Sequence, residues 1–280
     1  MSFVCSTGIG WTFDSSVSAR ALSVIIPSKT AANLLPCVEA VRKHEPEARI
    51  IVVDDGLEVY PIRMMESGPG IAGNCQIISG HKPFIFARNV NLGIRAAGDS
   101  DCVILNDDAI LETPGGFSIM QAAAAENPQV GIIGAVTDLT GQPAQRRPRN
   151  TDLEHAARKC PAMGLRAVEH IAFVCVLLPA RTRRAIAEYG PTTLQVFTSG
   201  LLDERYTAYG SDDLDYCMQV REAQMLVCVH DACYVNHGSL RSSYRGLPTQ
   251  AGDIWPNHRI LRAKWKMGPN PADPLVRASR

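Results

Sequence analysis

The stretch Cys102-Val103-Ile104-Leu105-Asn106-Asp107-Asp108 places two carboxylates directly after a short apolar run. The apolar part indicates a buried strand, so the acidic residues would stand at the mouth of a sheet. Carboxylate oxygens are hard ligands that suit Mg²⁺ or Mn²⁺, and such ions commonly carry diphosphates. The alternative is a simple strand-to-loop turn, where Asn and Asp are favoured in any case.

A second acidic pair, Asp54-Asp55, comes directly after the apolar run from Ile50 to Val53. Strand and helix patterns alternate around both pairs. The expected strands are 22–26, 50–53, 76–78, 102–105 and 130–136, and the expected helices are 31–43, 88–97 and 116–126. This alternation predicts a parallel, doubly wound α/β sheet with ligands beyond the carboxyl ends of its strands. Two acidic clusters at matching strand ends favour a ligand site.

The second half of the chain has a less regular pattern. Its polar, Pro- and Arg-rich stretch 137–168 indicates a long loop with a short helix at 153–159. Beyond it we expect strands at 168–178, 225–229 and 232–235, and helices at 181–188, 211–223 and 256–266. The chain therefore divides into a loose arm (1–20), two halves of one domain (21–136 and 137–245) and a basic C-terminal tail or helix (246–280).

Composition bounds the function only weakly. The 280 residues are 46% apolar, enough for a sizeable core, and 28 Lys and Arg balance 28 Asp and Glu, so the net charge points to no polyanionic partner. Locally, Arg146, Arg147 and Arg149 form a basic group ahead of the basic tail. Such groups are either solvated surface or a site for a diphosphate or an acidic acceptor.

The cysteines indicate a reducing compartment. There are nine, an odd number, and none forms a CxxC pair. Five lie in apolar runs and are expected to be buried free thiols: Cys75, Cys102, Cys175, Cys228 and Cys233. We find no signal peptide and no apolar run long enough to span a bilayer. A cytoplasmic protein is therefore expected, with peripheral binding at the inner face of a membrane left open.

Three carboxylates crowd the expected start of the helix 211–223. Ser211 is a good N-cap, and acidic residues in a first turn favour the helix dipole, so capping is the simpler interpretation. Yet Asp212, Asp213 and Asp215 exceed what capping requires. Repulsion between them should raise the pKa of at least one, which suits a general base.

His237 follows the apolar strand expected at 232–235. It is either a structural histidine, the commoner case, or a neutral imidazole that binds a metal. The chain between Asp213 and His237 has room for a helix, a turn and a strand. That path would return His237 to the end of the sheet at which Asp213 lies.

Six segments in this order resemble the family 2 glycosyltransferases, which have the GT-A nucleotide-sugar-binding fold. The segments are Val24-Ile25-Ile26-Pro27-Ser28, Ile51-Val52-Val53-Asp54-Asp55-Gly56, Arg88-Asn89-Val90-Asn91-Leu92-Gly93-Ile94, Leu105-Asn106-Asp107-Asp108, Leu202-Asp203-Glu204-Arg205-Tyr206 with Asp212-Asp213-Leu214-Asp215, and Val235-Asn236-His237-Gly238. The resemblance covers about residues 21–245. It implies a GT-A type α/β fold with a Rossmann-like, mostly parallel central sheet flanked by helices and a smaller acceptor-side subregion.

The resemblance also implies roles for individual residues. The base and ribose pocket would be lined by Pro27, Ser28, Asp54 and Asp55. The ribose or diphosphate would lie near Arg88 and Asn91, and the ribose and metal beside Asn106 and Asp107. The metal, Mn²⁺ or Mg²⁺, would be held by Asp108 and His237. The catalytic base would be Asp213, with Asp212 next to it near the acceptor.

The implied activity is inverting transfer of a sugar, a hexose in the first instance, from a nucleotide sugar to an acceptor hydroxyl. We expect a UDP-sugar donor bound by residues 21–136 and an acceptor bound by residues 137–245. The acceptor is open between a glycan, a lipid-linked sugar, a protein and a modified nucleic acid. The sequence departs from the family pattern at Leu57 (usually Ser), Gln219 (often Arg), Gln224 (usually Gly) and Asn106 (usually an acid).

Two alternatives remain. A nucleotidyltransferase of related fold usually carries a Gly-rich, basic loop after its first strand, but residues 27–32 contain no glycine. A non-catalytic module that binds a nucleotide sugar or a glycan would not need the full set of Asp108, Asp213 and His237, which is intact here.

Overall fold

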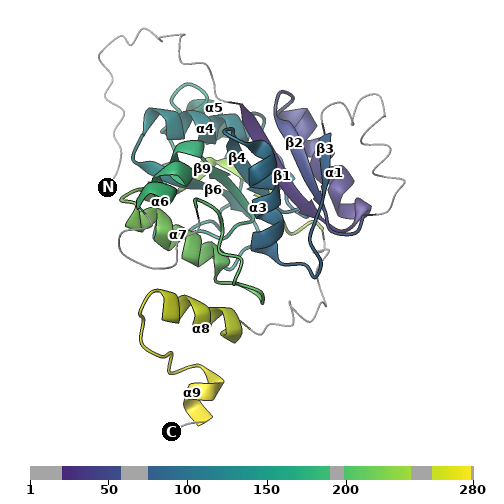
Figure 1. The fold of residues 1–280 in the computed structure, drawn as a ribbon. Helices are drawn as coiled ribbons and strands as arrows, with labels where there is room; N and C mark the ends of the chain where they lie inside the picture. The colour runs from purple at the N-terminus through teal and green to yellow at the C-terminus, as the bar shows by residue number, and fades with distance from the viewer. Residues whose placement is uncertain (1–20, 58–74, 190–198, 241–253, 279–280) are drawn as a thin grey trace.

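The computed structural model describes residues 21–57, 75–189, 199–240 and 254–278 (Figure 1). The strands are β1 (Leu22–Ser28), β2 (Arg49–Asp54), β3 (Cys75–Ser79), β4 (Asp101–Leu105), β5 (Ile110–Leu111), β6 (Val130–Thr137), β7 (Leu165–Ala167), β8 (Cys175–Leu178) and β9 (Leu226–Asn236). The helices are α1 (Ala31–His44), α3 (Phe86–Ala97), α4 (Gly116–Glu126), α5 (Thr151–Ala157), α6 (Ala180–Tyr189), α7 (Asp212–Glu222), α8 (Trp255–Lys264) and α9 (Pro274–Ala278).

All nine strands belong to one sheet, in the order β3-β2-β1-β4-β8-β6-β9-β5, with β7 paired to β9. Successive side chains of a strand point to opposite faces, so each apolar strand feeds two cores. On one face Val24 and Ile26 pack with residues of α1 and α4. On the other, Ile25 packs with residues of α3, α6 and α7, which lie on the viewer's side of the sheet in Figure 1. The predicted α/β class with helices on both faces is confirmed.

The parallel strands β2, β1 and β4 create the edge at which the acidic clusters lie. Ser28 at the end of β1 is in register with Asp54 at the end of β2, and Ile25 is in register with Ile104. Asn106 to Asp108 therefore leave β4 beside the end of β1. The predicted arrangement of acidic residues at the carboxyl edge is confirmed.

The alternation predicted a parallel sheet and the resemblance a mostly parallel one, whereas the sheet is mixed. β8 runs antiparallel to both β4 and β6. The single strand expected at 168–178 is also wrong, because only 175–178 forms β8 while β7 ends at Ala167. One cause is Gln145, whose side chain accepts the Ala172 N–H at 2.6 Å and donates to the Ala172 carbonyl at 3.2 Å. A side chain thus occupies backbone groups that a strand partner would need.

The two strands expected at 225–229 and 232–235 are one strand, β9. Its parallel pairing with β6 shifts register between His230 and Tyr234. Within this bulge, Nδ1 of the buried His230 accepts the Ala232 N–H at 3.2 Å, and its Nε2 donates to the Pro161 carbonyl at 2.7 Å. The polar pair His230-Asp231 therefore marks a bulge and not a chain break.

The thiols in the described part of the chain are all free. Four of the five cysteines expected to be buried are so, but Cys75 is only half-buried, because it lies on the edge strand β3.

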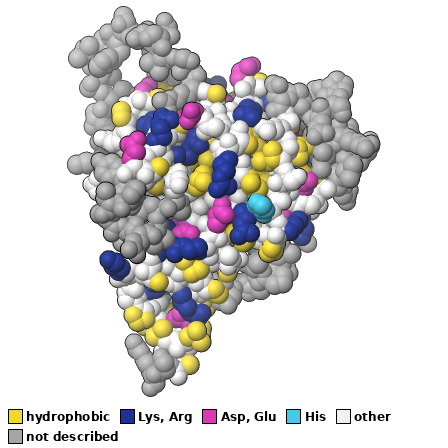
Figure 2. Space-filling view, in the orientation of Figure 1, with side chains coloured by type: hydrophobic (Ala, Val, Ile, Leu, Met, Phe, Trp, Pro, Cys, Tyr) yellow, Lys and Arg dark blue, Asp and Glu magenta, His cyan; other side chains and the backbone are white. Residues whose placement is uncertain are grey.

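On the face drawn in Figure 2, basic and acidic side chains are scattered among one another, as the balanced composition suggests. Within the described residues, no helix has the length and apolar character needed to cross a bilayer. The N-terminal arm 1–20 lies outside the described residues.

Candidate active site

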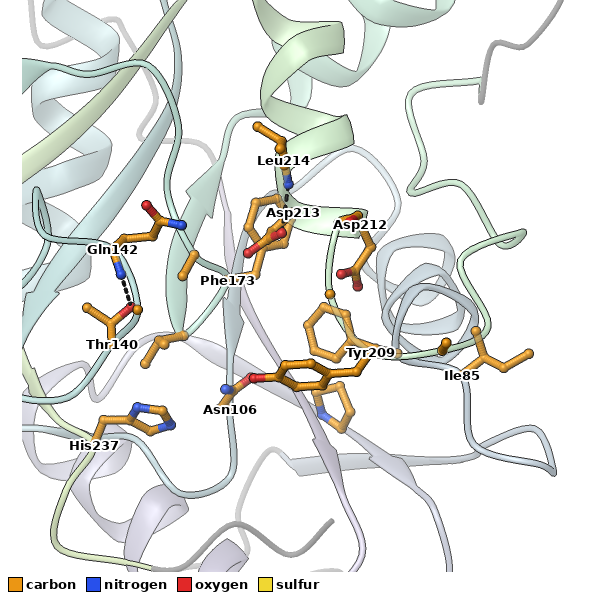
Figure 3. Close-up of a pocket in the computed structure, with 18 of the residues that line it drawn as sticks. Ile85, Asn106, Thr140, Gln142, Phe173, Tyr209, Asp212, Asp213, Leu214 and His237 are labelled. Atoms are coloured by element: carbon orange, nitrogen blue, oxygen red, sulfur yellow. Dashed lines mark hydrogen bonds between the residues drawn. The ribbon is translucent and has the colours of Figure 1, made fainter. Parts of the chain in front are cut away.

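A pocket of about 470 Å³ opens at the carboxyl edge of the sheet. It brings together loops that are far apart in the chain (Figure 3). Seven of the predicted site residues line it: Pro27, Asn106, Asp107, Asp108, Asp212, Asp213 and His237. The other predicted residues, Ser28, Asp54, Asp55, Arg88 and Asn91, are not part of its lining.

Asp108 and His237 form a pair of polar side chains in this lining. Asp108 is 5% exposed, and its Oδ1 lies 3.1 Å from Nε2 of His237. The opposite ring nitrogen, Nδ1, is 2.7 Å from the Leu139 carbonyl oxygen. Because a carbonyl can only accept, Nδ1 must carry a proton. In the neutral ring, Nε2 therefore presents a lone pair to a carboxylate that is also an acceptor.

Two like acceptors in contact need a positive charge between them. A second proton on the ring is one solution: burial alone would lower the pKa of His237, but the Asp108 carboxylate raises it above its usual range. A divalent cation is the other. A carbonyl that fixes the tautomer of a histidine is a common outer partner in metal sites. Neighbouring ligands of an octahedral Mg²⁺ ion are about 3 Å apart, given bonds of about 2.1 Å, so the pair fits such an ion.

Among the described residues, Asp108 and His237 alone would leave the shell of a metal ion incomplete. Within the described ranges, no group of three or more His, Cys, Asp or Glu side chains is arranged to hold a metal ion. Small hard cations often bind through one or two protein groups together with phosphate oxygens and water. The pair thus suits a cation that arrives with a diphosphate.

Asp107 and Asn106 support this pair from the same turn. Asp107 is 3% exposed, and its Oδ2 accepts a hydrogen bond of 2.7 Å from the Ser28 hydroxyl. The backbone of Asn106 is held by the Val174 carbonyl on one side and by the Ala109 N–H on the other, at 3.0 and 3.1 Å. Ser28 therefore contributes indirectly, by orienting a carboxylate of the pocket wall.

Asp212 and Asp213 enter the pocket from the start of α7, away from His237 (Figure 3). Loss of water at the pocket wall raises the pKa of both carboxyl groups, and the charge of Asp213 raises that of Asp212 further. The hydrogen bond from the Leu214 N–H, and then the nearby His170, partly offset the rise in the pKa of Asp213. The expected raised pKa in this acidic run is present, with burial as its main cause, and a carboxylate of raised pKa is a stronger proton acceptor.

Ser211 does not cap α7 as expected. It occupies the N-cap position, but its side chain makes no capping hydrogen bond and its φ is 71°, in the left-handed region. Gly210 before it also has a positive φ of 76°. The two residues turn the chain sharply, and this turn places Asp212 and Asp213 at the pocket. A left-handed serine is uncommon and requires support from its surroundings.

The other predicted site residues are engaged beside the pocket. Oδ1 of Asp54 accepts the Gly56 and Leu57 N–H groups, each at 2.7 Å, and so forms the turn after β2. Asp55 is 1% exposed and its carboxylate pairs with Lys82 at 2.7 Å.

Arg88 and Asn91 face the loop that leads toward α7. Arg88 lies 3.5 Å from the Glu204 carboxylate. Asn91 is buried, and its amide bonds both the N–H and the carbonyl of Leu202 at 2.9 Å. These contacts fix the loop from the side of α3.

Several pocket residues were not predicted. Four aromatic side chains, Phe84, Phe86, Phe173 and Tyr209, line it together with His170, Thr140 and Gln142. Most of them lie in irregular segments, where hydrophobic periodicity gives no signal. His170 is the exception, because the polar pair Glu169-His170 interrupts the apolar run 168–178. That interruption lies between the end of β7 at Ala167 and the start of β8 at Cys175, where the chain forms part of the pocket wall.

The sequence of the chain matches the family model described as glycosyl transferase family 2 over residues 23–189, more than half of its length. The chain belongs to glycosyl transferase family 2. This family 2 match ends before Asp212, Asp213 and His237, so those residues join the site through the geometry described above. No curated protein sequence matches the chain.

Solved structures share the fold of this family 2 chain. One is GalNAc-T7 with UDP, GalNAc and Mn²⁺, with 12% identity and a TM-score of 0.59 over 79% of this chain and 44% of that protein. Another is the mannosyltransferase PcManGT from Pyrobaculum calidifontis with GDP-Man and Mn²⁺, with 14% identity and a TM-score of 0.55 over 81% of this chain and 59% of that protein. The chain thus spans about half the length of these relatives.

Proposed function

We propose that the chain is a metal-dependent, inverting glycosyltransferase that moves a sugar from a nucleotide sugar to an acceptor hydroxyl. The single observation that carries this proposal is the placement of two groups in one pocket. Asp108 and His237 offer a cation site on one side, and Asp212 and Asp213 offer carboxylates of raised pKa on another. Such a pocket suits a leaving diphosphate and a proton acceptor at the same time.

The cation would be Mn²⁺ or Mg²⁺, held by Asp108 and His237. When bound, it supplies positive charge to the diphosphate as the bond to the sugar breaks. UDP-sugars are the first donors to test and GDP-sugars the second, since structures of the same fold hold UDP in one case and GDP-Man in the other. Pro27 and Asp107 line the same wall and would contact the nucleoside side of the donor.

Asp213 would act as the general base. Its carboxylate takes the proton of the acceptor hydroxyl while the oxygen attacks the anomeric carbon, and the bond from that carbon to the diphosphate oxygen breaks. One displacement inverts the carbon, so no covalent intermediate is needed. Asp212 lies beside the base and would bind the acceptor. Residues 21–136 would bind the donor and residues 137–245 the acceptor.

A thermal-shift panel tests this proposal. The purified chain is heated with each nucleotide sugar, with the free nucleotides UDP and GDP, and with or without Mn²⁺. We expect stabilisation by one nucleotide family only when Mn²⁺ is present, and none in the Asp108→Ala variant. Asp152→Ala, at an exposed position of α5, is the matched control and should keep the stabilisation. Equal stabilisation with and without metal would reject the metal-dependent donor site.

A further inference from the structure

Helix α8 lies beyond the residues that match the family model and packs beneath α7 (Figure 1). It contacts the segment 203–215, which carries both carboxylates of raised pKa. Two buried side chains of α8 make these contacts: Asn257, which is 0% exposed, and Lys264, which is 6% exposed. A polar residue that is fully buried in a surface helix is held there by specific hydrogen bonds.

Asn257 bonds the backbone on both sides of Tyr209. Its Oδ1 accepts the Ala208 N–H at 3.0 Å, and its Nδ2 donates to the Gly210 carbonyl at 2.7 Å. Tyr209 itself is 52% exposed and lines the pocket. In Figure 3 its ring extends into the pocket below Asp212. One amide group of α8 thus holds the backbone one residue before and one residue after the residue that carries this ring.

The far end of α8 fixes α7. Nζ of Lys264 lies 2.7 Å from Oδ2 of Asp215 and 3.0 Å from Oδ2 of Asp203. Trp265 donates its indole N–H to Oδ1 of Asp215 at 2.8 Å. Asp215 is fully buried and lies two residues after Asp213. Lys264 therefore balances a buried charge in the first turn of α7.

Between these two anchors lies the left-handed turn Gly210-Ser211. A strained turn persists when the structure on each side determines it. Asn257 holds the chain before the turn, and Lys264 holds the chain after it. The ring of Tyr209 is the exposed aromatic group of this segment, and aromatic rings present an apolar face with a polar tip. The C–H face of a sugar ring is a suitable partner for such a group.

We propose that Asn257 is a positioning residue: through the backbone around Tyr209, α8 presents that ring as a stacking surface for the sugar ring of the acceptor, beside Asp213. This inference rests on the proposed function. It makes the acceptor a saccharide, and it makes α8 part of the acceptor site although none of its residues lines the pocket as described.

The first test is hydrogen–deuterium exchange of the purified full chain. Asn257→Ala should speed exchange at least tenfold in the peptides that cover 207–213, while the strands keep their protection. Arg262→Ala is the control on the same helix, because the Arg262 side chain donates to the nearby Gly268 carbonyl; this variant should leave the 207–213 segment unchanged. Unchanged exchange in Asn257→Ala would overturn the role of Asn257 in holding the 207–213 segment. An equal loss of protection throughout the chain would overturn it as well.

The second test is saturation-transfer NMR with a panel of methyl glycosides as acceptor probes, in the presence of UDP or GDP and Mn²⁺. Tyr209→Ala and Asn257→Ala should each weaken glycoside binding about tenfold, and the double variant should be little weaker than either single one, because both act through one ring. Tyr209→Phe should retain binding. Three results would overturn the saccharide assignment. The first is additive effects of the two substitutions, the second is unchanged glycoside binding in Tyr209→Ala, and the third is no glycoside binding by the wild type.

The two tests separate this inference from the proposed function. If no nucleotide stabilises the wild-type chain with Mn²⁺, the proposed function fails, while the exchange experiment still decides whether Asn257 holds the 207–213 segment. If nucleotide binding is intact in Asn257→Ala and glycoside binding is lost, both stand.

Discussion

Nε2 of His237 lies 3.1 Å from Oδ1 of Asp108, although the two residues are 129 positions apart in the chain. The Leu139 carbonyl holds the proton of the ring on the other nitrogen. Two acceptors that the fold brings into contact form a site for positive charge, and this relationship links the strand end at β4 to the strand end at β9.

Removing either partner should weaken metal-dependent nucleotide binding. We expect Asp108→Ala and His237→Ala to weaken binding of UDP or GDP with Mn²⁺ by at least about 10–100-fold, because the loss of an outer partner of a metal ligand already costs that much. Isothermal titration with the nucleotide at fixed Mn²⁺ measures this. Binding without metal should change little, and a variant that binds the metal complex as well as the wild type does would exclude its residue as a ligand.

Replacing the proposed base should lower the turnover rate and leave donor binding nearly unchanged. Asp213→Asn keeps the size of the side chain but cannot accept the proton, so we expect turnover to fall by about 10²–10⁴-fold. Donor binding in titration should stay within about threefold. The wild-type rate should also fall as the pH drops through the raised pKa of the pair Asp212 and Asp213. Near-complete turnover by Asp213→Asn would rule out the assigned base.

The same carboxylates should destabilise the folded chain at neutral pH. Because their pKa values are raised in the folded state, ionisation costs stability at pH values above the folded pKa, and the cost vanishes below the unfolded pKa near 4. Asp212→Asn should therefore raise Tm by about 2–4 °C at pH 8, for a gain of about 1 kcal/mol. The gain should disappear by pH 4. A pH-independent change in Tm would show that the substitution acts by another route.

Lys264 should stabilise the chain strongly. Lys264→Ala leaves the buried carboxylates Asp203 and Asp215 without their ammonium partner, and breaking a buried pair in this way typically costs about 3–5 kcal/mol. Chemical denaturation measures the loss. The exposed Lys159→Ala is the matched control and should change the free energy of unfolding by less than about 0.5 kcal/mol.

Acid should remove part of the stability of this cluster. Burial alone would raise the pKa of Asp203, but Arg205 and Lys264 hold it at about 2. A carboxyl group with a depressed pKa stabilises the folded state at pH values above its unfolded pKa near 4. This stabilisation is lost as the pH falls toward 2. The difference in stability between wild type and Lys264→Ala should therefore shrink over this range. A constant difference from pH 6 to pH 2 would contradict the assigned ion pair.

The elements that periodicity marks clearly were predictable from the sequence. The runs before Asn106 and before Asp54 form strands whose carboxyl ends meet at one edge, and α4 has the predicted bounds. Gln224 has a φ of 59°, a left-handed conformation that favours glycine, which is the residue that the family pattern led us to expect there. Hydrophobic periodicity is enough to predict a strand or helix whose conformation depends mainly on its own residues.

The remaining features depend on contacts between distant segments. The Gln145 side chain occupies the backbone groups of Ala172, between β7 and β8, and the bulge at His230 joins two predicted strands into one. The link between Asn257 and Ala208 has no sequence signature, because an isolated Asn in a helical pattern looks like a surface residue. Trp265 likewise anchors the end of α8 through its indole N–H, which donates to Asp215.

Pulsed electron paramagnetic resonance of Mn²⁺ bound to the chain with UDP or GDP tests the central claim most directly. The account predicts one Mn²⁺ ion coupled both to a histidine nitrogen and to the phosphorus nuclei of the diphosphate, with the nitrogen coupling lost in His237→Gln. A spectrum equal to that of the Mn²⁺–nucleotide complex in buffer, or a nitrogen coupling that His237→Gln leaves in place, would contradict it.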